Sequence, residues 1–563
     1  MRTKLLNLWR WFIHRRPEIL LALFLLGLVP LAAFLVQEAL ALVQRVWNHP
    51  KGFLMVIRND PWPALAVLTC AVGTAALVFV LWRNWGFIWA VARKMIVEAL
   101  HRKVVLILLV FFGVLTLSLP FLLKTEGSVK SQVQIMLLYS LALALLLLSL
   151  VAIFVSAASI CSEVEHKQVQ VTDTKPLRRW QFLVGKWLGA VIMCAAALFV
   201  MTGAAYVLVW YTVRPPDFAR MTPRELEKAM ADYDAVFTEV LTARRSVKAI
   251  EPLGVDEEAE KAVAELKAQG TWPNKPTQRT WAIEQLRKQV LARRLNVEPG
   301  GSLGWIVPGL KPGQEGELQV RFRGYASGLE RRLLGRWVVY ERKPPGADGA
   351  EGDDRPRMVP AGVSLPPTGG WSSDLKQQFS VPAEHVSDDG ALYLAYENRS
   401  PRASVVFDGD LMLEVLQEEK TFFPNYYRTL VVVFCHVALL AALGLMAGSV
   451  FSFPVASLTV MFFFFVGLIG PWLVQFTEPA KLAEFPLMVD IVHTIARNSM
   501  RVFLAVMPHF GAFNPLGDLT DGKLVPWRTV FGAGAIMFYV KGGFALLIGI
   551  YFYSRRELAR VIV

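Results

Sequence analysis

The sequence predicts a multi-span α-helical membrane protein of about eight spans, with a large polar α+β domain inserted in its middle. Three observations predict this class. Hydrophobic residues make up 54% of the 563 residues and the mean hydropathy is +0.41, which is too apolar for an ordinary soluble domain. Apolar runs long enough to cross a bilayer recur along the chain. A long polar stretch, from Tyr211 to Asn425, separates two groups of these runs.

Each expected span is an apolar run of about twenty residues, the length that crosses the hydrocarbon core of a bilayer. The first run follows a basic N-terminus, which is also typical of a signal peptide. No convincing small-residue cleavage site follows it, so we expect a retained span. The eight expected spans are Ile19–Val36, Pro61–Trp82, Val104–Leu123, Val133–Ser156, Trp187–Trp210, Tyr427–Ala447, Val455–Val474 and Val530–Tyr553.

Two further segments have apolar residues at helical spacing but carry too many charges to span. Arg83–Lys103 has this pattern, and we expect an amphipathic helix at the cytoplasmic interface. A second pattern covers Phe485–Val506 and includes Asp490 and Arg497. We expect residues 476–526 to form interfacial helices at the outer membrane surface.

The distribution of charge predicts the orientation of the spans. Residues 211–424 hold 29 Lys and Arg against 32 Asp and Glu, so the formal net charge of +13 arises elsewhere in the chain. The basic residues gather in short segments between spans, which is the positive-inside pattern of cytoplasmic loops. We expect both termini in the cytoplasm and residues 213–425 outside. Nucleic acid is not an expected partner, because the basic residues form no patch on a folded domain.

The polar domain changes its pattern near Gly300. A Thr-Pro-Arg-Glu start at Thr222 predicts one helix over Arg224–Ile250, within a helical hairpin or stalk over residues 221–296. Alternating polar and apolar residues then predict an antiparallel β-sandwich over residues 300–420. The expected strands are Leu318–Phe322, Arg336–Arg342, Ala391–Glu397, Ser404–Phe407 and Leu411–Leu416.

Aromatic residues of the expected sandwich allow two interpretations. Trp337, Trp371 and Tyr393, together with Tyr340 and Tyr396, are suited to a platform on which sugar rings stack. Aromatic residues at alternating strand positions more often fill a sandwich core. We favour the core and keep glycan binding as the alternative, because a fold alone is no evidence of a binding site.

The most informative stretch is the charged cytoplasmic segment between the fourth and fifth spans, residues 157–186. Basic residues there are explained by lipid headgroups alone. Headgroup binding does not explain an acidic pair ahead of the basic residues, or a proline that holds its neighbour extended. We expect a contact with a partner protein through Glu163, Glu165, Lys175, Pro176, Arg178 and Arg179.

This stretch resembles the first cytoplasmic loop of ABC-2-type transporter permeases. The resemblance lies in the acidic pair, the Lys-Pro-Leu-Arg-Arg core at Lys175–Arg179 and the Phe-Leu-Val-Gly-Lys that follows it. The tail Arg555–Leu558 is also similar to the family. The chain departs from it at His166–Gln168, where many members have Gly-Thr. The resemblance covers Arg83–Val213 and Thr429–Val563.

The resemblance implies a domain organisation. The family core begins with an interfacial helix, so residues 1–82 are expected to be a two-span N-terminal extension. Residues 83–212 are then the first half of a six-span permease core, and residues 426–563 are its second half. The polar domain is inserted between the two halves.

The resemblance also implies the function: a permease subunit of an ABC exporter in a bacterial cytoplasmic membrane, with the six charged-loop residues as its ATPase-coupling loop. The implied partners are a dimer of separate ATP-binding subunits, a second permease copy or paralogue, and membrane lipid. The chain contains no P-loop, so ATP hydrolysis is expected in the partner. The rival interpretation is a non-transporting anchor or force-transmitting scaffold whose sandwich binds envelope components.

Two ionisable residues lie within expected spans, His436 in the sixth and Lys541 in the eighth. Such residues normally face the protein interior or a water-filled path. They are therefore candidates for the lining of a translocation path, or for a buried contact with a neighbouring span.

The sequence offers no enzyme chemistry. It contains no nucleophile elbow and no HExxH motif. The four cysteines lie in or beside apolar runs at spacings that form no zinc site, and neither a metal nor a cofactor is expected.

Overall fold

The structure is a computed structural model in which two units are described separately. It describes residues 82–101, 104–122, 128–165, 178–213, 222–249, 255–268, 276–313, 316–327, 332–343, 357–365, 370–373, 375–407, 413–475, 498–500, 503, 507, 508 and 510–555. The first two expected spans and most of Phe485–Val506 lie outside these residues. Unit 1 is Met1–Leu241 with Phe422–Val563, and unit 2 is Thr242–Thr421.

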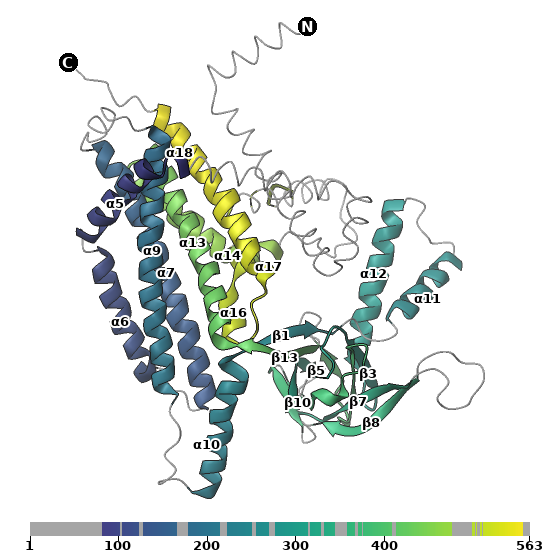
Figure 1. Cartoon of the computed structure of the whole chain (residues 1–563). Coiled ribbons are helices and arrows are strands. Elements are labelled where there is room, and N and C mark those ends of the chain that lie inside the picture. The colour runs from purple at the N-terminus through teal and green to yellow at the C-terminus, as the bar shows by residue number, and fades with distance from the viewer. Residues whose placement is uncertain are drawn as a thin grey trace, which may run out of the picture. The chain divides into compact units, whose positions relative to one another are not determined.

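Unit 1 is helical. Figure 1 shows its long helices α6, α7, α9, α13 and α18 running side by side. Its elements are α5 (Trp85–His101), α6 (Val104–Leu122), α7 (Val129–Glu165), α9 (Arg179–Thr212), α10 (Pro223–Ala235), the π-helix η2 (Val236–Val240), α13 (Phe422–Val450), α14 (Phe453–Gln475), the 3-10 helix η4 (Gly511–Phe513), α16 (Pro515–Thr520), α17 (Trp527–Ala533), the π-helix η5 (Gly534–Gly542) and α18 (Gly543–Arg555).

Five helices among the described residues are long and apolar enough to cross a membrane. They are α7, α9, α13, Phe453–Gly470 of α14 and the continuous stretch Trp527–Arg555. The third expected span is also helical, as α6, but its apolar part Ile107–Ser118 is shorter. The six expected spans that fall on described residues are therefore all helices. The amphipathic helix expected at Arg83–Lys103 is present as α5.

Helix α7 is longer than the span predicted at Val133–Ser156. It has 37 residues, which makes it about 55 Å long against a hydrocarbon core of about 30 Å. The hydroxyl of Ser128 accepts a hydrogen bond from the backbone N–H of Ser131 at 3.3 Å and caps its first turn. The helix continues to Glu165, and α9 already begins at Arg179. The segment predicted as a loop over residues 157–186 is therefore helical at both ends.

Helix α5 packs against α9 where glycines lie one turn apart. A Cβ atom at Gly185 would lie 2.7 Å from the Cβ of Val91 and 2.8 Å from the carbonyl oxygen of Ile88. A Cβ atom at Gly189 would lie 2.8 Å from the carbonyl oxygen of Ala92. Small residues four apart let helix backbones approach closely in membranes, where apolar burial alone does not drive association.

Helices α7 and α13 approach in the same way. A Cβ atom at Gly444 would overlap the hydroxyl of Ser156, and one at Gly448 would lie 3.0 Å from the carbonyl oxygen of Ala157. The thiol of Cys161 donates to the carbonyl of Gly448 at 3.7 Å. The two glycines again lie four residues apart, so the α5–α9 and α7–α13 contacts use the same spacing.

Unit 2 combines a helical hairpin with short antiparallel strands. The hairpin helices are joined by an ion pair of 2.6 Å between Arg294 and Glu258, and this hydrogen bond lowers the pKa of the Glu258 carboxyl. The elements are β1 (Thr242–Lys248), α11 (Val255–Ala268), α12 (Pro276–Arg294), β2 (Asn296–Val297), β3 (Ser302–Val307), β4 (Glu317–Phe322), β5 (Gly324–Ala326), β6 (Arg332–Leu333), β7 (Gly335–Lys343), β8 (Arg357–Leu365), β9 (Trp371–Ser372), β10 (Gln377–Pro382), the 3-10 helix η3 (Ala383–His385), β11 (Leu392–Asn398), β12 (Val405–Phe407) and β13 (Leu413–Thr421).

Two four-stranded sheets share one core, which makes the expected sandwich. Their strand orders are β1-β13-β4-β10 and β3-β11-β7-β8. Leu318, Val320 and Phe322 of β4 are buried and alternate with more exposed residues, as the period of a strand requires. The rings of Phe322, in the first sheet, and Trp337, in the second, lie 4.9 Å apart. The burial of Tyr396 in this core raises the pKa of its hydroxyl to about 12.

The single helix predicted over Arg224–Ile250 is wrong. The helix ends with η2 at Val240, and Thr242–Lys248 form β1, which pairs antiparallel with β13. The partner of Thr242 is Thr421, far along the chain. Local propensity did not show this strand because the pairing that forms it is not local.

We predict that Gly189→Leu separates α5 from α9. The added side chain would meet the α5 backbone, and overpacking of this kind costs about 1–3 kcal/mol or more. The measurement is the temperature at which half of the detergent-solubilised protein loses its monodisperse peak, which should fall. Gly203→Leu is the matched control, because a Cβ at Gly203 on the same helix meets nothing within 4 Å. Equal temperatures for the two variants would contradict the packing described.

Candidate functional site

The residues expected in the coupling loop are carried by the ends of two helices. Glu163 and Glu165 lie on the last turn of α7, and Arg178 and Arg179 stand at the start of α9. Lys175 and Pro176 lie outside the described residues. The short connection that remains, residues 166–177, therefore joins two helix ends.

Glu163 is buried among lysines, with 3% of its surface exposed. Its Oε1 lies 3.0 Å from the Nζ of Lys186 on α9 and 3.6 Å from the Nζ of Lys94 on α5. We call Lys94, Glu163 and Lys186 the Glu163 cluster. Lys186 also donates to the carbonyl oxygen of Ser159 at 2.7 Å, and its Nζ lies 5.2 Å from the ring centre of Phe182.

The Glu163 cluster joins three helices, α5, α7 and α9. Lys186 is 2% exposed, so neither it nor Glu163 is solvated. Removing one partner of such a buried pair costs about 3–5 kcal/mol, because the other charge stays buried without compensation. Glu163 therefore positions the helix ends, and it does not offer its carboxylate to the surface.

The start of α9 is tied to two neighbouring helices. The side chain of Gln181 accepts from the backbone N–H of Arg178 at 2.9 Å and donates to the side chain of Asn84 at 2.8 Å. Arg179 donates to the carbonyl oxygen of Ser554 at 2.5 Å, at the end of α18. The side chain of Arg178 is exposed, as is that of Glu165 on α7. Among the expected coupling residues that the structure describes, these two are the ones with exposed side chains.

Lys541 lies on the π-helix η5 and donates from Nζ to the carbonyl oxygen of Met507. The backbone N–H of Met507 donates to the carbonyl of Phe503 at 3.0 Å. Lys541 thus ties this segment to the last span.

His436 is buried in the middle of α13, with 3% of its surface exposed. Its ring packs edge to face with Phe510 at 5.1 Å, and neither ring nitrogen has a hydrogen-bond partner among the described residues. His436 and Lys541 therefore both contact the segment that runs from Met507 to Phe510. These contacts favour the buried-contact interpretation for this conformation.

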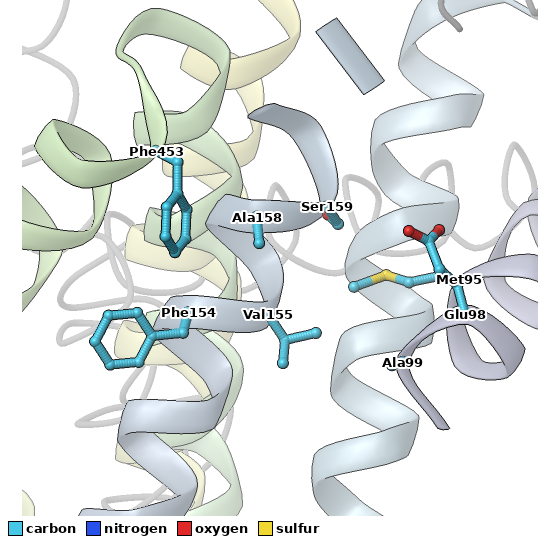
Figure 2. Close-up of a pocket in the computed structure, with 8 residues that line it drawn as sticks. All are labelled: Met95, Glu98, Ala99, Phe154, Val155, Ala158, Ser159 and Phe453. Carbon is cyan, nitrogen blue, oxygen red and sulfur yellow. The ribbon is translucent and has the colours of Figure 1, made fainter. Parts of the chain in front are cut away.

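An apolar pocket of about 230 Å³ lies between α5, α7 and α14. Figure 2 shows Phe154 and Phe453 on one side of it and Met95 and Glu98 on the other. Among the described residues that line it, Glu98 is the ionisable one. Ser159, which accepts the hydrogen bond from Lys186, also lines it, so the pocket lies directly beside the Glu163 cluster.

The three aromatic residues considered for glycan stacking are buried. Trp337, Trp371 and Tyr393 are 0%, 3% and 5% exposed. The indole N–H of Trp371 donates to the hydroxyl of Tyr396 at 3.3 Å, also inside the core. Rings covered in this way favour the core interpretation, because stacking on a sugar requires an open ring face.

Comparison with known families supports the interpretation of the helices. Residues 89–224 match the family described as ABC-2 family transporter protein. The matched range runs from α5 into α10 and so includes the Glu163 cluster. No curated protein matches the chain. Over residues 89–224 the chain is thus similar to this permease family, and its apolar helices support a multi-pass membrane protein.

The sequence reasoning did not identify the partners of Glu163. Lys186 lies in the charged segment over residues 157–186 and Lys94 in the amphipathic helix expected at Arg83–Lys103, and neither pattern indicates a partner for Glu163. The sequence does contain an indication of this pair. Lys186 directly precedes an apolar run, and a lysine at the edge of a membrane span is stabilised by an acidic partner. Which acidic residue it meets depends on how three helices pack.

We predict that Glu163→Gln lowers the free energy of unfolding by about 3–5 kcal/mol, because it leaves the Lys186 ammonium buried without its counter-charge. Denaturant titration in mixed micelles would measure it. Glu165→Gln, on the same turn but exposed, is the control and should change the value by no more than about 0.5 kcal/mol.

The double variant Glu163→Gln with Lys186→Met should regain most of this loss, since it removes the orphaned charge. A cost for Glu163→Gln no larger than that for Glu165→Gln would show that the buried pair does not hold the helices.

Proposed function

We propose that the chain is the permease subunit of an ABC transporter and is driven by a separate pair of ATP-binding subunits. The observation that carries the proposal is the family match over residues 89–224, a range that includes the helix ends at which the coupling residues stand. The match favours transport over a non-transporting scaffold. A second permease copy or a paralogue would complete the path through the membrane.

The proposed contact with the ATPase is the connection between α7 and α9. Arg178 and Glu165 present exposed charges on its two sides, and the sequence adds Lys175 and Pro176 between them. An exposed arginine forms bidentate hydrogen bonds with carboxylates of a partner. The proposed orientation places this end of the bundle and both termini in the cytoplasm, and unit 2 outside, in agreement with the basic residues between the spans.

The mechanism follows from the way the three helices are joined. Closure of the ATPase dimer would push on residues 166–178. Because the Glu163 cluster joins α5, α7 and α9, and glycine contacts join α5 to α9, these three helices would move as one body. Such a rotation, made in both permease copies, opens and closes a path between them. Surrounding lipid and the apolar pocket beside the cluster accommodate the change.

We propose that Lys541 and His436 lie beside segments that move during transport. Both contact residues Met507–Phe510 in the conformation described. A path lined by these two side chains requires that this segment moves away from α13 and η5.

We predict that Arg178→Glu reduces the ATP hydrolysis that the permease stimulates by roughly fivefold or more, equivalent to a coupling free energy of at least about 1 kcal/mol. The reversed charge would repel the acidic partner groups that an exposed arginine binds. The rate is measured on the co-purified complex in nanodiscs, after membrane insertion has been checked by fractionation.

Arg179→Glu is the informative comparison, because Arg179 bonds to Ser554 within the bundle. It should lower thermal stability as well as stimulation, whereas Arg178→Glu should leave stability unchanged. If no ATP-binding subunit co-purifies with the wild-type chain, the proposed function is wrong. If stimulation survives Arg178→Glu, the loop meets lipid headgroups instead.

A further inference from the structure

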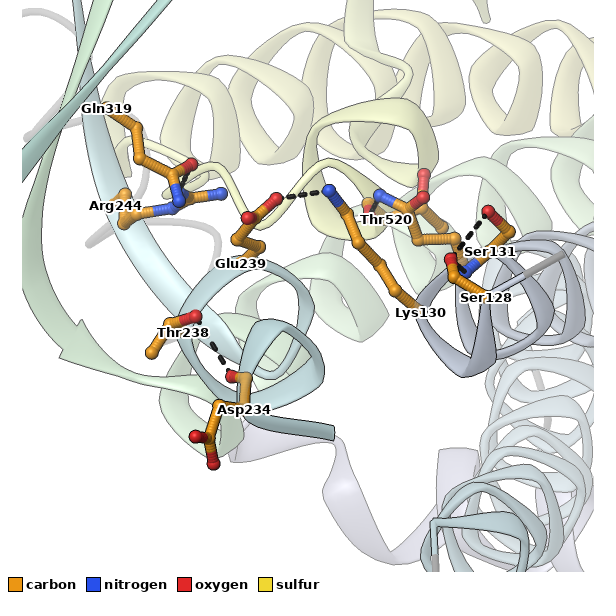
Figure 3. A network of polar contacts seen from close by, with 10 residues as sticks. Ser128, Lys130, Ser131, Asp234, Thr238, Glu239, Arg244, Gln319 and Thr520 are labelled. Carbon is orange, nitrogen blue, oxygen red and sulfur yellow. Dashed lines mark hydrogen bonds and ion pairs between the residues drawn. The ribbon is translucent and has the colours of Figure 1, made fainter. Parts of the chain in front are cut away.

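The N-terminal end of α7 is held by polar groups of α10 and η2. The carboxylate of Asp232 accepts a hydrogen bond from the backbone N–H of Val129. Lys130 forms an ion pair with Glu239, which Figure 3 shows. We call these four residues the Asp232 clamp. A carboxylate at this place satisfies an N–H that has no partner within α7, and the helix dipole favours its charge.

The clamp is partly shielded from water. The side chains of Lys130 and Glu239 are 21% and 13% exposed, so salt screens this pair less than a surface pair. Gln134, one turn further along α7, donates to the carbonyl of Thr520 on α16 at 3.1 Å. The same end of α7 is therefore attached to α10, η2 and α16.

Apolar contacts reinforce the clamp. Val236 and Val240 of η2 are fully buried and belong to the same core as Val133 and Met136 of α7. The ring of Phe237, on η2, lies 6.1 Å from that of Trp210 on α9. Because it is held on both its polar and its apolar faces, η2 must follow α7 when α7 moves.

The chain passes from unit 1 into unit 2 without linker residues. Leu241 alone separates η2 from β1, and β13 is followed directly by α13 at Phe422. Thr242 and Thr421, the first residue of β1 and the last of β13, are partners in the β1–β13 pairing. A displacement of η2 relative to α13 therefore acts directly on a pair of hydrogen-bonded strands.

Helix α7 itself is suited to carry a displacement from end to end. It contains neither glycine nor proline over its 37 residues, and sharp helix kinks almost always need such residues or an inserted group. One end carries the Glu163 cluster and the other end the Asp232 clamp. A displacement of the Glu165 end of α7 is therefore carried to its other end, because the helix does not bend between them.

We propose that α7 and the Asp232 clamp transmit the ATPase-driven movement to unit 2, so that unit 2 is a moving part of the transport cycle. The inference rests on the proposed function, since it needs an ATPase that displaces α7. It adds the route: from the α7–α9 connection through α7 and the clamp to η2, and from there into β1 and β13.

The test is hydrogen–deuterium exchange of the full-length chain, in nanodiscs with its ATP-binding subunits, with and without MgATP and vanadate. In the wild type, trapping should change exchange in residues 155–165 of α7 and also in β1 and β13. In the double variant Asp232→Ala with Glu239→Ala, which removes both acceptor groups of the clamp, the change in β1 and β13 should be lost while that in residues 155–165 remains.

Two further variants separate transmission from unfolding. The charge swap Lys130→Glu with Glu239→Lys keeps an ion pair at this place with the two charges exchanged. It should therefore retain at least part of the wild-type change in exchange in β1 and β13. Glu258→Gln breaks an ion pair within unit 2, between α11 and α12, and should leave the wild-type response intact.

The outcomes distinguish this inference from the proposed function. If β1 and β13 still respond in the double variant, or never respond in the wild type although residues 155–165 do, transmission through the clamp is overturned. If residues 155–165 do not respond in the wild type, the proposed function fails and this inference fails with it.

Discussion

The buried pair of Glu163 and Lys186, with Lys94 beside it, is the interaction on which the helical bundle depends. A charge among apolar helices is stable only when its counter-charge and hydrogen bonds are in place. Glu163 meets this requirement only when α5, α7 and α9 are all docked. Gly185 brings the α5 backbone close enough for that contact, because no side chain stands between the helices. Charge and close packing thus require each other at this end of the bundle.

Helix α7 likewise combines close apolar packing with polar contacts, but at different places along its length. Its middle is apolar and packs against α13 through small residues, which gives contact without polar specificity. Its two ends carry polar groups, Glu163 at one and the first turn bound by Asp232 and Glu239 at the other. Polar contacts at the ends therefore define which neighbours α7 holds, and the apolar middle keeps the helix in the membrane.

The parts that sequence reasoning predicted are those that depend on periodicity and local length. The expected spans within the described residues are all helical. Four of the expected strands, such as Leu318–Phe322, lie in the two four-stranded sheets, and Ser404–Phe407 overlaps β12 of a separate three-stranded sheet. The strand Thr242–Lys248 was predicted as helix because its partner, β13, is more than 160 residues away. The residues expected to form one contact surface also separate, since Glu163 is buried while Glu165 and Arg178 are exposed. Burial depends on neighbouring helices that local sequence does not specify.

The sequence by itself determined that the chain is a multi-pass membrane protein with an inserted polar domain, because apolar length and strand alternation are local properties. It also indicated the ABC-2 resemblance through the charged residues around Arg178. Only the tertiary structure decided which of those charges are internal. It showed that Glu163 meets Lys186, that Arg179 meets Ser554 and that Asp232 caps α7. Each of these contacts joins residues distant in the chain, and only the packing of the helices brings them together.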